Sequence, residues 1–85
     1  MVQIVYLKAG ESTPDVRDYE RWLTVEATSD GLFYGVGASL KPTGEWVGYS
    51  SLPEDDEDLE RALKAAEVWA EHYNVPTIWV QASVN

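Results

Sequence analysis

One run of side chains in this sequence has the number and spacing to do chemistry. It consists of five consecutive carboxylates, Glu54, Asp55, Asp56, Glu57 and Asp58. A calcium site needs oxygen ligands spaced by a loop with a sharp turn, whereas this run contains no glycine. Acids in the first turn of a helix interact favourably with its dipole, but fewer than five would suffice. We interpret the run as a solvated helix start, as a patch for a basic partner or, third, as a metal site, and we expect no bound metal.

Candidates for catalysis are few. His72 is the single histidine, and no Ser-His-Asp pattern surrounds it, so its place near an expected helix end favours contact with free carbonyls. Residues 35–37 (Gly-Val-Gly) could begin a phosphate loop, but a third glycine is missing and no helix follows. A glycosidase needs two carboxylates across a cleft, which a domain of this size rarely forms. We therefore expect no catalytic residue and no cofactor.

The charge of the chain restricts its partners. Fifteen acids and six bases give a formal net charge of −9. Direct binding to nucleic acid or to an anionic membrane is disfavoured, because contact with phosphates requires Lys and Arg. A basic protein surface is favoured, since opposite fields speed encounter. The alternative is that the excess acid only provides solubility.

Large aromatic side chains suggest a second surface. The chain has four Trp and five Tyr. In the strand alternation, Trp22, Phe33 and Trp46, with Trp79, fall opposite the positions expected to point inward. If they gather on one open sheet face, they form an apolar patch for a partner or for a second copy of the chain. Alternatively, such rings pack across Gly35 and Gly37 and complete a small second core.

The elements that would position these residues follow from hydrophobic periodicity. Alternating runs predict strands at residues 2–8, 19–28, 32–40, 45–50 and 77–84, with Asp30-Gly31 as a hairpin turn. A capping box at residues 51–54 and an apolar stripe from Leu59 to Tyr73 predict one helix, ended by Asn74 and Pro76. The order β-β-β-β-α-β predicts a two-layer α+β domain. Its helix would cover one face of an antiparallel sheet of four or five strands, and the last strand would lie beside or parallel to the first.

Length and composition indicate one domain, residues 1–85. The absence of cysteine excludes a disulfide scaffold and thiolate metal sites, so a reducing compartment is the better expectation. The run at residues 2–7 has no basic region before it and is too short for a signal or membrane segment. We expect a cytoplasmic protein.

A resemblance is carried by the meander of residues 19–50, the acidic helix opening from Glu54 to Glu60 and the closing strand at residues 77–84. In this plan the chain resembles small acidic inhibitors encoded by phages and mobile elements, such as anti-CRISPR proteins, over most of their length. The resemblance implies action by occupancy, with carboxylates where nucleic-acid phosphates would bind. It also implies a Cas-type or other nucleic-acid-binding target in the host cytoplasm, and no cofactor.

These observations lead to three functional hypotheses. The first is a small acidic protein-binding module, an inhibitor that occupies a basic surface through residues 54–58 and the aromatic residues Trp22, Phe33 and Trp46. The second is a structural or homo-oligomerising domain that uses the aromatic sheet face. The third is a small hydrolase or ligand-binding domain with a pocket around His72.

Overall fold

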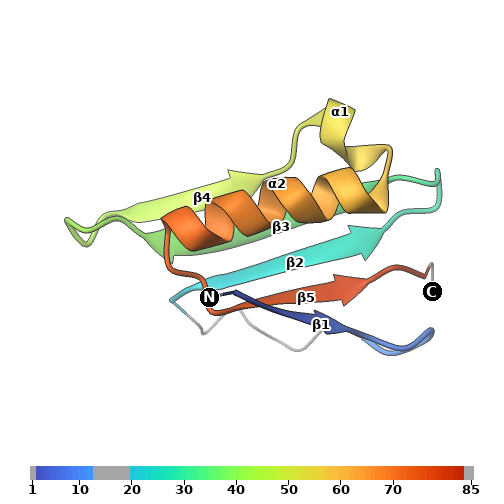
Figure 1. The fold of residues 1–85 in the computed structure, drawn as a ribbon, viewed down its shortest axis with the longest axis horizontal. Helices are drawn as coiled ribbons and strands as arrows, with labels where there is room; N and C mark the ends of the chain where they lie inside the picture. The colour runs from blue at the N-terminus through green and yellow to red at the C-terminus, as the bar shows by residue number, and fades with distance from the viewer. Residues whose placement is uncertain (1, 13–19, 84–85) are drawn as a thin grey trace.

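The computed structural model describes residues 2–12 and 20–83, and the predicted alternating runs form its strands. The strands are β1 (Gln3–Tyr6), β2 (Trp22–Ala27), β3 (Phe33–Leu40), β4 (Trp46–Ser50) and β5 (Thr77–Gln81). Two helices, α1 (Pro53–Asp56) and α2 (Leu59–His72), precede β5 (Figure 1). The predicted strand residues at position 19 and at position 84 lie outside the described residues.

The five strands form one mixed sheet in the order β1-β5-β2-β3-β4. β5 lies between β1 and β2 and runs parallel to both, while β2, β3 and β4 form an antiparallel meander. The α+β class and the parallel pairing of the last strand with the first are confirmed. The expected antiparallel pairing holds for the meander alone and the sheet as a whole is mixed, because the helical crossover returns the chain in the direction that parallel pairing needs.

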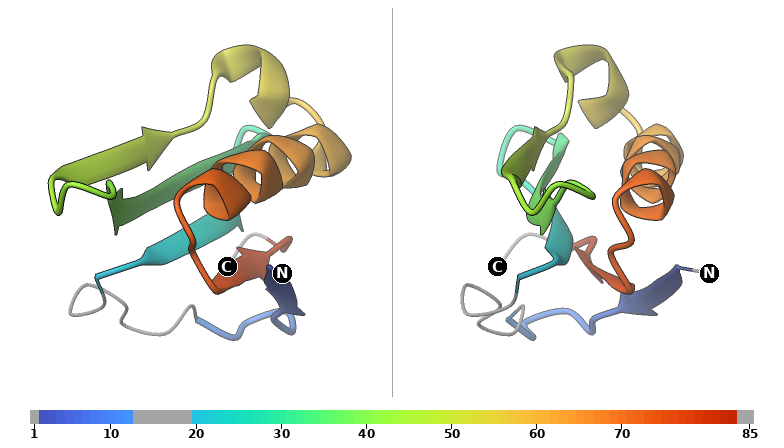
Figure 2. Two further views of the ribbon diagram at one scale, coloured as in Figure 1. Left: turned by 60° about the vertical axis from the view of Figure 1, so that its left-hand side comes forward. Right: turned by 90° about the vertical axis from the view of Figure 1, so that its left-hand side faces the viewer.

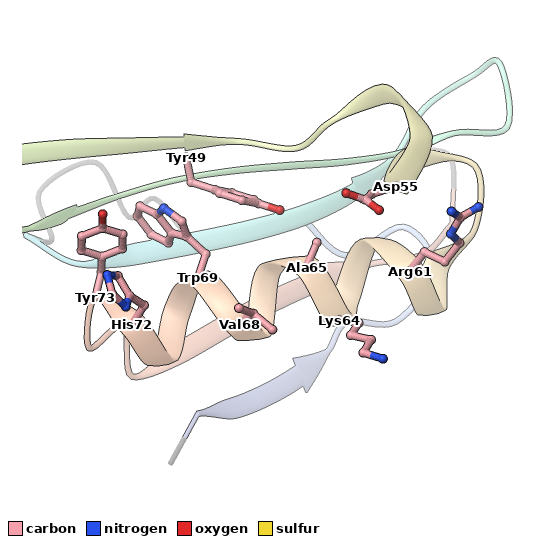
Figure 3. Close-up of a pocket in the computed structure, with 9 residues that line it drawn as sticks. All are labelled: Tyr49, Asp55, Arg61, Lys64, Ala65, Val68, Trp69, His72 and Tyr73. Atoms are coloured by element: carbon pink, nitrogen blue, oxygen red, sulfur yellow. The ribbon is translucent and has the colours of Figure 1, made fainter.

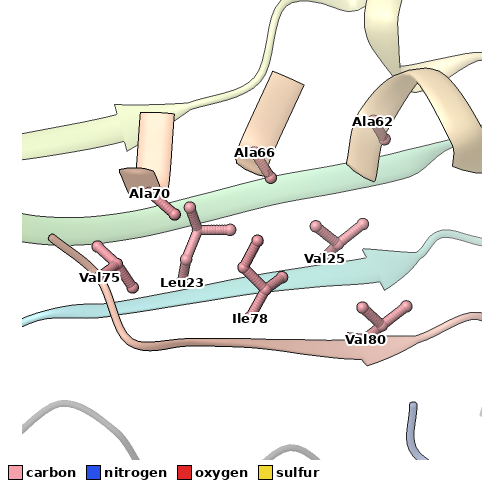
Figure 4. Packing of buried hydrophobic residues seen from close by; sticks show 8 residues of the cluster. All are labelled: Leu23, Val25, Ala62, Ala66, Ala70, Val75, Ile78 and Val80. Atoms are coloured by element: carbon pink, nitrogen blue, oxygen red, sulfur yellow. The ribbon is translucent and has the colours of Figure 1, made fainter. Parts of the chain in front are cut away.

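α2 covers one face of the sheet, as the end-on view in Figure 2 shows. Its buried face consists of Ala62, Ala66 and Ala70. These small side chains allow the helix backbone to approach the sheet closely. The core below them contains the buried side chains Leu23, Val25, Val75, Ile78 and Val80 (Figure 4).

The acidic segment does not continue into one long helix. α1 ends at Asp56, and Asp58 adopts an extended backbone and caps α2, accepting a hydrogen bond from the Glu60 backbone N–H at 2.9 Å. The predicted capping box is therefore wrong: Ser51 accepts a hydrogen bond from the backbone N–H of Gly35 instead. At the other end, Asn74 has a φ of 58° and terminates α2 as expected.

The face of β3 that meets the helix is the one with the smaller side chains. Gly37 pairs with Leu23 and Gly35 pairs with Val25, so both glycines share the face of these core residues. Phe33 is on the same face and packs against the core. Its expected place on the open face is therefore wrong. The larger residues Tyr34 and Val36 point to the opposite face.

A matched pair of leucines tests this packing. Leu23 is 0% exposed, whereas Leu63 is only partly buried at the margin of the core. We expect Leu23→Ala to lower the free energy of unfolding by about 3 kcal/mol, because it leaves a cavity under α2, and Leu63→Ala to lower it by about 1 kcal/mol. Denaturant titration measures both, and equal losses would contradict this placement of α2.

Candidate functional site

A groove of about 780 Å³ lies along α2, between this helix, the end of β4 and α1 (Figure 3). Its lining combines aromatic and charged side chains: Tyr49, Asp55, Arg61, Lys64, Ala65, Val68, Trp69, His72 and Tyr73. Asp55 lies at one end of the groove, and His72 and Tyr73 lie at the other (Figure 3). The groove is therefore apolar along its length and polar at both ends.

Three aromatic rings in contact with one another form the aromatic part of the groove. Tyr49 of β4 and Trp69 of α2 have ring centroids 5.1 Å apart, and Trp69 and Tyr73 have centroids 4.9 Å apart. Both pairs are tilted, at 40° and 45°. Such contacts add to the stabilisation from burial and fix the orientation of each ring. The groove consequently has a preformed aromatic surface.

Gly35 makes room for the first of these rings. A side-chain carbon at this position would lie 3.1 Å from Cε2 of Tyr49, which is closer than most real contacts. Because residue 35 is glycine, the Tyr49 ring can lie across β3. The same glycine holds the chain leading into α1, since its N–H and C=O bond to the side chain and backbone N–H of Ser51 at 2.9 and 3.0 Å. Gly35 thus helps to position both the Tyr49 ring and the segment that leads into α1.

The Tyr49 hydroxyl points toward Asp55 in Figure 3. It is buried and has no hydrogen-bond partner within the described part of the chain, and the same is true of Oδ1 of Asp56. Burial of the phenol, with the negative charges of Asp55 and then Asp56, raises the pKa of Tyr49 above its ordinary value of 10.0. The phenol is therefore neutral at pH 7.

The two basic residues that line the groove do not neutralise the charge of Asp55 through an ion pair. Arg61 and Lys64 are exposed, and within the described part of the chain neither forms an ion pair with Asp55. Lys64 extends away from Asp55 in Figure 3. The ring of His72 contacts Tyr73 edge-on, with centroids 4.6 Å apart. No partner for general acid–base catalysis by His72 is present among the residues described.

The structure separates the five predicted carboxylates into different environments. Glu54, Glu57 and Asp58 are exposed, and Asp58 caps α2. Asp55 is half-buried and lines the groove. Asp56 is only 7% exposed, so the expectation of an exposed run is wrong at this position. Within residues 2–12 and 20–83, no group of three or more His, Cys, Asp or Glu side chains is arranged to hold a metal ion.

The predicted aromatic face is correct for three of its four residues. Trp22 pairs with Ala38, Trp79 pairs with Thr24, and Trp46 pairs with Leu40, all with side chains opposite the helix. Trp46 is 68% exposed and lies over Gly48, whereas Trp22 and Trp79 are partly buried. Phe33 does not belong to this face. The large exposed side chains of this face are Trp46 and Tyr34, which lie toward opposite ends of the β3–β4 pair, since Trp46 pairs with Leu40 and Tyr34 bonds Ser50.

The sequence pattern does not by itself indicate that Tyr49, Trp69 and Tyr73 form one surface. The available signal was the spacing of Trp69 and Tyr73 by one helical turn, together with a strand of small residues at Gly35, Gly37 and Ser39. Large rings on one element and small residues on its neighbour indicate that the rings lie across the small residues. The contribution of Tyr49 depends on the pairing of β4 with β3, which no local pattern specifies.

Removal of the unpaired Tyr49 hydroxyl is expected to stabilise the folded state. Tyr49→Phe should raise the free energy of unfolding at pH 7 by about 1 kcal/mol, because it removes a buried group without a partner. Since the folded-state pKa is raised, the stability that depends on neutral Tyr49 is complete below pH 10.0 and falls as the pH rises further. Wild type should therefore lose stability faster than Tyr49→Phe above that pH. Chemical denaturation across this range is the measurement.

Tyr34→Phe is the matched control. It removes a hydroxyl that bonds Oγ of Ser50 at 2.9 Å on the exposed face, and should lower stability by about 0.5 kcal/mol. A loss of similar size for Tyr49→Phe would mean that the Tyr49 hydroxyl has a partner in solution.

Among the residues described, no helix is both long enough and apolar enough to cross a membrane. Comparison with models of protein families, with curated protein sequences and with solved structures found no match.

Proposed function

We propose that this protein is a small acidic module that binds a basic surface of a partner protein. One observation carries the proposal: the negative charge is concentrated on the helical segment. Residues 53–73 contain eight carboxylates and two bases, Arg61 and Lys64. α1 stands out from the two layers on the β4 side of the sheet (Figures 1 and 2). The exposed acids Glu54, on α1, and Glu57, directly after it, are therefore well placed to meet a partner.

The basic surface that we propose is one that binds nucleic acid. Such surfaces present Lys and Arg side chains to phosphates, and a protein carrying clustered carboxylates can occupy them instead. Small acidic phage-encoded inhibitors, to which the sequence plan is similar, often act in this way. A Cas-type effector or another nucleic-acid-binding protein is accordingly the proposed target, and inhibition by occupancy is the proposed mechanism. The module would need neither a cofactor nor a catalytic group for this role.

The role of the exposed helical acids can be tested by charge removal. The variant Glu54→Gln, Glu57→Gln, Glu60→Gln removes three charges from the helical segment without removing the cap at Asp58. Its association with the partner should slow by about fivefold at low salt, and the salt dependence of the rate should flatten. Partners are selected from a panel of Cas-type effectors and other nucleic-acid-binding proteins by displacement of labelled nucleic acid, and the rates are measured by stopped-flow mixing.

A second triple variant, Glu20→Gln, Glu26→Gln, Asp30→Asn, provides the control because it removes the same charge from exposed positions just before β2, within it and in the turn after it. It should retain most of the wild-type rate. Equal slowing by both variants would show that only net charge matters. Failure to displace nucleic acid from any member of the panel would refute inhibition by occupancy.

Self-association through the open sheet face is a second candidate function. The observation that favours it is the exposure of two aromatic residues on this face, Trp46 at 68% and Tyr34 at 43%. Exposed aromatic side chains that share one face are typical of interfaces. A second copy of the chain would present the same face and pair with it through a two-fold axis.

Trp46→Lys tests this candidate. The substitution places a charge within the proposed contact, at a side chain that is 68% exposed and lies over Gly48 on the surface. Sedimentation velocity of wild type at high salt should show a dimer whose population grows with concentration, and the variant should remain monomeric. A monomeric wild type at all concentrations would eliminate this function.

A further inference from the structure

We propose that the outer edge of β4 binds the β4 strand of a second copy of this chain, so that the two sheets join edge to edge. This pairing rests on self-association, the second candidate function, and assigns the contact to the backbone of the edge strand. It differs from the face-to-face pairing considered above and does not involve the acidic segment. The supporting features are the direction of the backbone groups of β4, their symmetry about Gly48 and the position of the Trp46 ring.

The hydrogen bonds between β3 and β4 show which residues of β4 face its neighbour. At one end of the pair, the N–H of Lys41 donates to the C=O of Glu45 at 2.8 Å. At the other end, the N–H of Ser51 donates to the C=O of Gly35 at 3.0 Å. Along an antiparallel strand, successive residues direct their backbone groups to opposite sides. The odd-numbered residues from Glu45 to Ser51 therefore direct their N–H and C=O groups toward β3.

The backbone groups of Trp46, Gly48 and Ser50 consequently point away from the sheet. β4 has β3 as its one neighbour in the described sheet, and no described residue forms a hydrogen bond with these outward groups. α1 lies beyond the arrowhead of β4 in Figure 1. Edge strands are commonly protected by a charged residue or by proline, and the sequence of β4, Trp-Val-Gly-Tyr-Ser, contains neither. An edge of this kind can accept another strand.

The outward groups are arranged symmetrically about Gly48, which favours a second copy as the occupant. In an antiparallel β4–β4 pair with a two-fold axis at this residue, Trp46 lies opposite Ser50 of the other copy. Gly48 lies opposite its own counterpart. Opposite residues of this type exchange both of their backbone hydrogen bonds, so every outward group of both strands is paired. Both copies use the same surface, and the assembly therefore closes as a dimer.

The same symmetry brings the two Trp46 rings together. The ring of Trp46 lies over Gly48, because a side-chain carbon at residue 48 would be only 2.6 Å from Cη2 of the indole. In the pair, the two glycines are adjacent at the axis, and each ring extends over the glycine of its own strand from the opposite end. The rings thus become neighbours across the two strands. Cross-strand aromatic pairs stabilise sheets, and this one would cover a side chain that is 68% exposed.

Electrostatic repulsion between copies also favours contact at β4. Each copy has a formal net charge of −9, so repulsion is smallest where carboxylates are absent. No residue of β4 is charged. Salt screens the remaining repulsion, and the dimer should therefore become stronger as the ionic strength rises. Binding of the acidic segment to a basic partner has the opposite dependence on salt.

Amide hydrogen exchange of the wild-type chain tests the pairing without any substitution. The exchange is measured by NMR in high salt at increasing protein concentration. The amides of Trp46, Gly48 and Ser50 should exchange rapidly in the monomer and at least about tenfold more slowly once the dimer forms. A face-to-face dimer leaves these amides without a hydrogen-bond partner and does not produce this pattern.

The other edge of the sheet provides the matched control for hydrogen exchange. In β1, the N–H of Gln3 donates to Pro76 at 3.0 Å, so the amides of Ile4 and Tyr6 point away from β5. β1 is also an edge strand of the described sheet. Exchange at Ile4 and Tyr6 should not depend on protein concentration. Slowing at these two amides instead of the β4 amides would overturn the proposal.

Two substitutions at one position isolate the backbone contribution. Gly48→Pro removes an outward N–H and leaves the bonds to β3 intact, since proline is tolerated in an edge strand where its N–H would face solvent. Gly48→Ala is the matched control, because its side chain displaces the Trp46 ring in the same way but keeps the N–H. In sedimentation velocity, the dimer of Gly48→Pro should be at least about tenfold weaker than that of Gly48→Ala. Retained protection of the inward amides of Val47 and Tyr49 checks that both variants are folded.

Failure of this pairing is distinguishable from failure of the candidate functions. A dimer that forms without slower exchange at Trp46, Gly48 and Ser50, or that is equally strong in Gly48→Pro and Gly48→Ala, overturns edge pairing and retains self-association through the open face. A wild-type chain that remains monomeric at millimolar concentration in high salt eliminates both. The acidic module is tested separately, by its association with a basic partner.

Discussion

The packing of three alanines of α2 on the branched side chains of β2 and β5 determines where every other large side chain can lie. Ala62, Ala66 and Ala70 are small, and the buried cluster that they form with the sheet in the described structure contains no aromatic residue. The rings of Trp69 and Tyr73 are therefore placed at the flank of α2. There they meet Tyr49, which crosses β3 over a glycine. The groove is thus a geometric result of a thin core.

The sequence pattern predicts the position of each strand better than it predicts which side of the strand is buried. Period-two alternation located all five strands, and the Asp-Gly turn and the Asn74 terminator are where the pattern placed them. Alternation alone does not say which side of a strand is buried. In β3 the more apolar set, with Tyr34 and Val36, suggested the inward side. The helix instead faces Gly35 and Gly37, because the space above these glycines is filled by side chains from elsewhere in the fold.

The acidic run illustrates a second limit of local patterns. A capping box and a favourable first turn predicted one helix, but Ser51 is engaged by the backbone of β3, and the chain restarts its helix at Asp58. This contact is non-local, since it depends on the β3–β4 register. It also turns Asp56 inward, where a carboxylate loses hydration. The candidate site was therefore predictable in its charge, which composition determines, and not in its shape, which depends on the pairing of distant strands.

The position of β5 divides the sheet into a local part and a non-local part. In the described sheet β1 has one neighbour, β5, and Gln3 pairs with Thr77 across almost the whole sequence. The meander of β2, β3 and β4 closes short loops, whereas the β1–β5 and β2–β5 pairings close long ones at a greater cost in chain entropy. Without β5, β2 would present an unpaired edge that carries the core side chains Leu23 and Val25. Such an edge can recruit a strand from another molecule, so the docking of β5 also protects the sheet against edge-to-edge association.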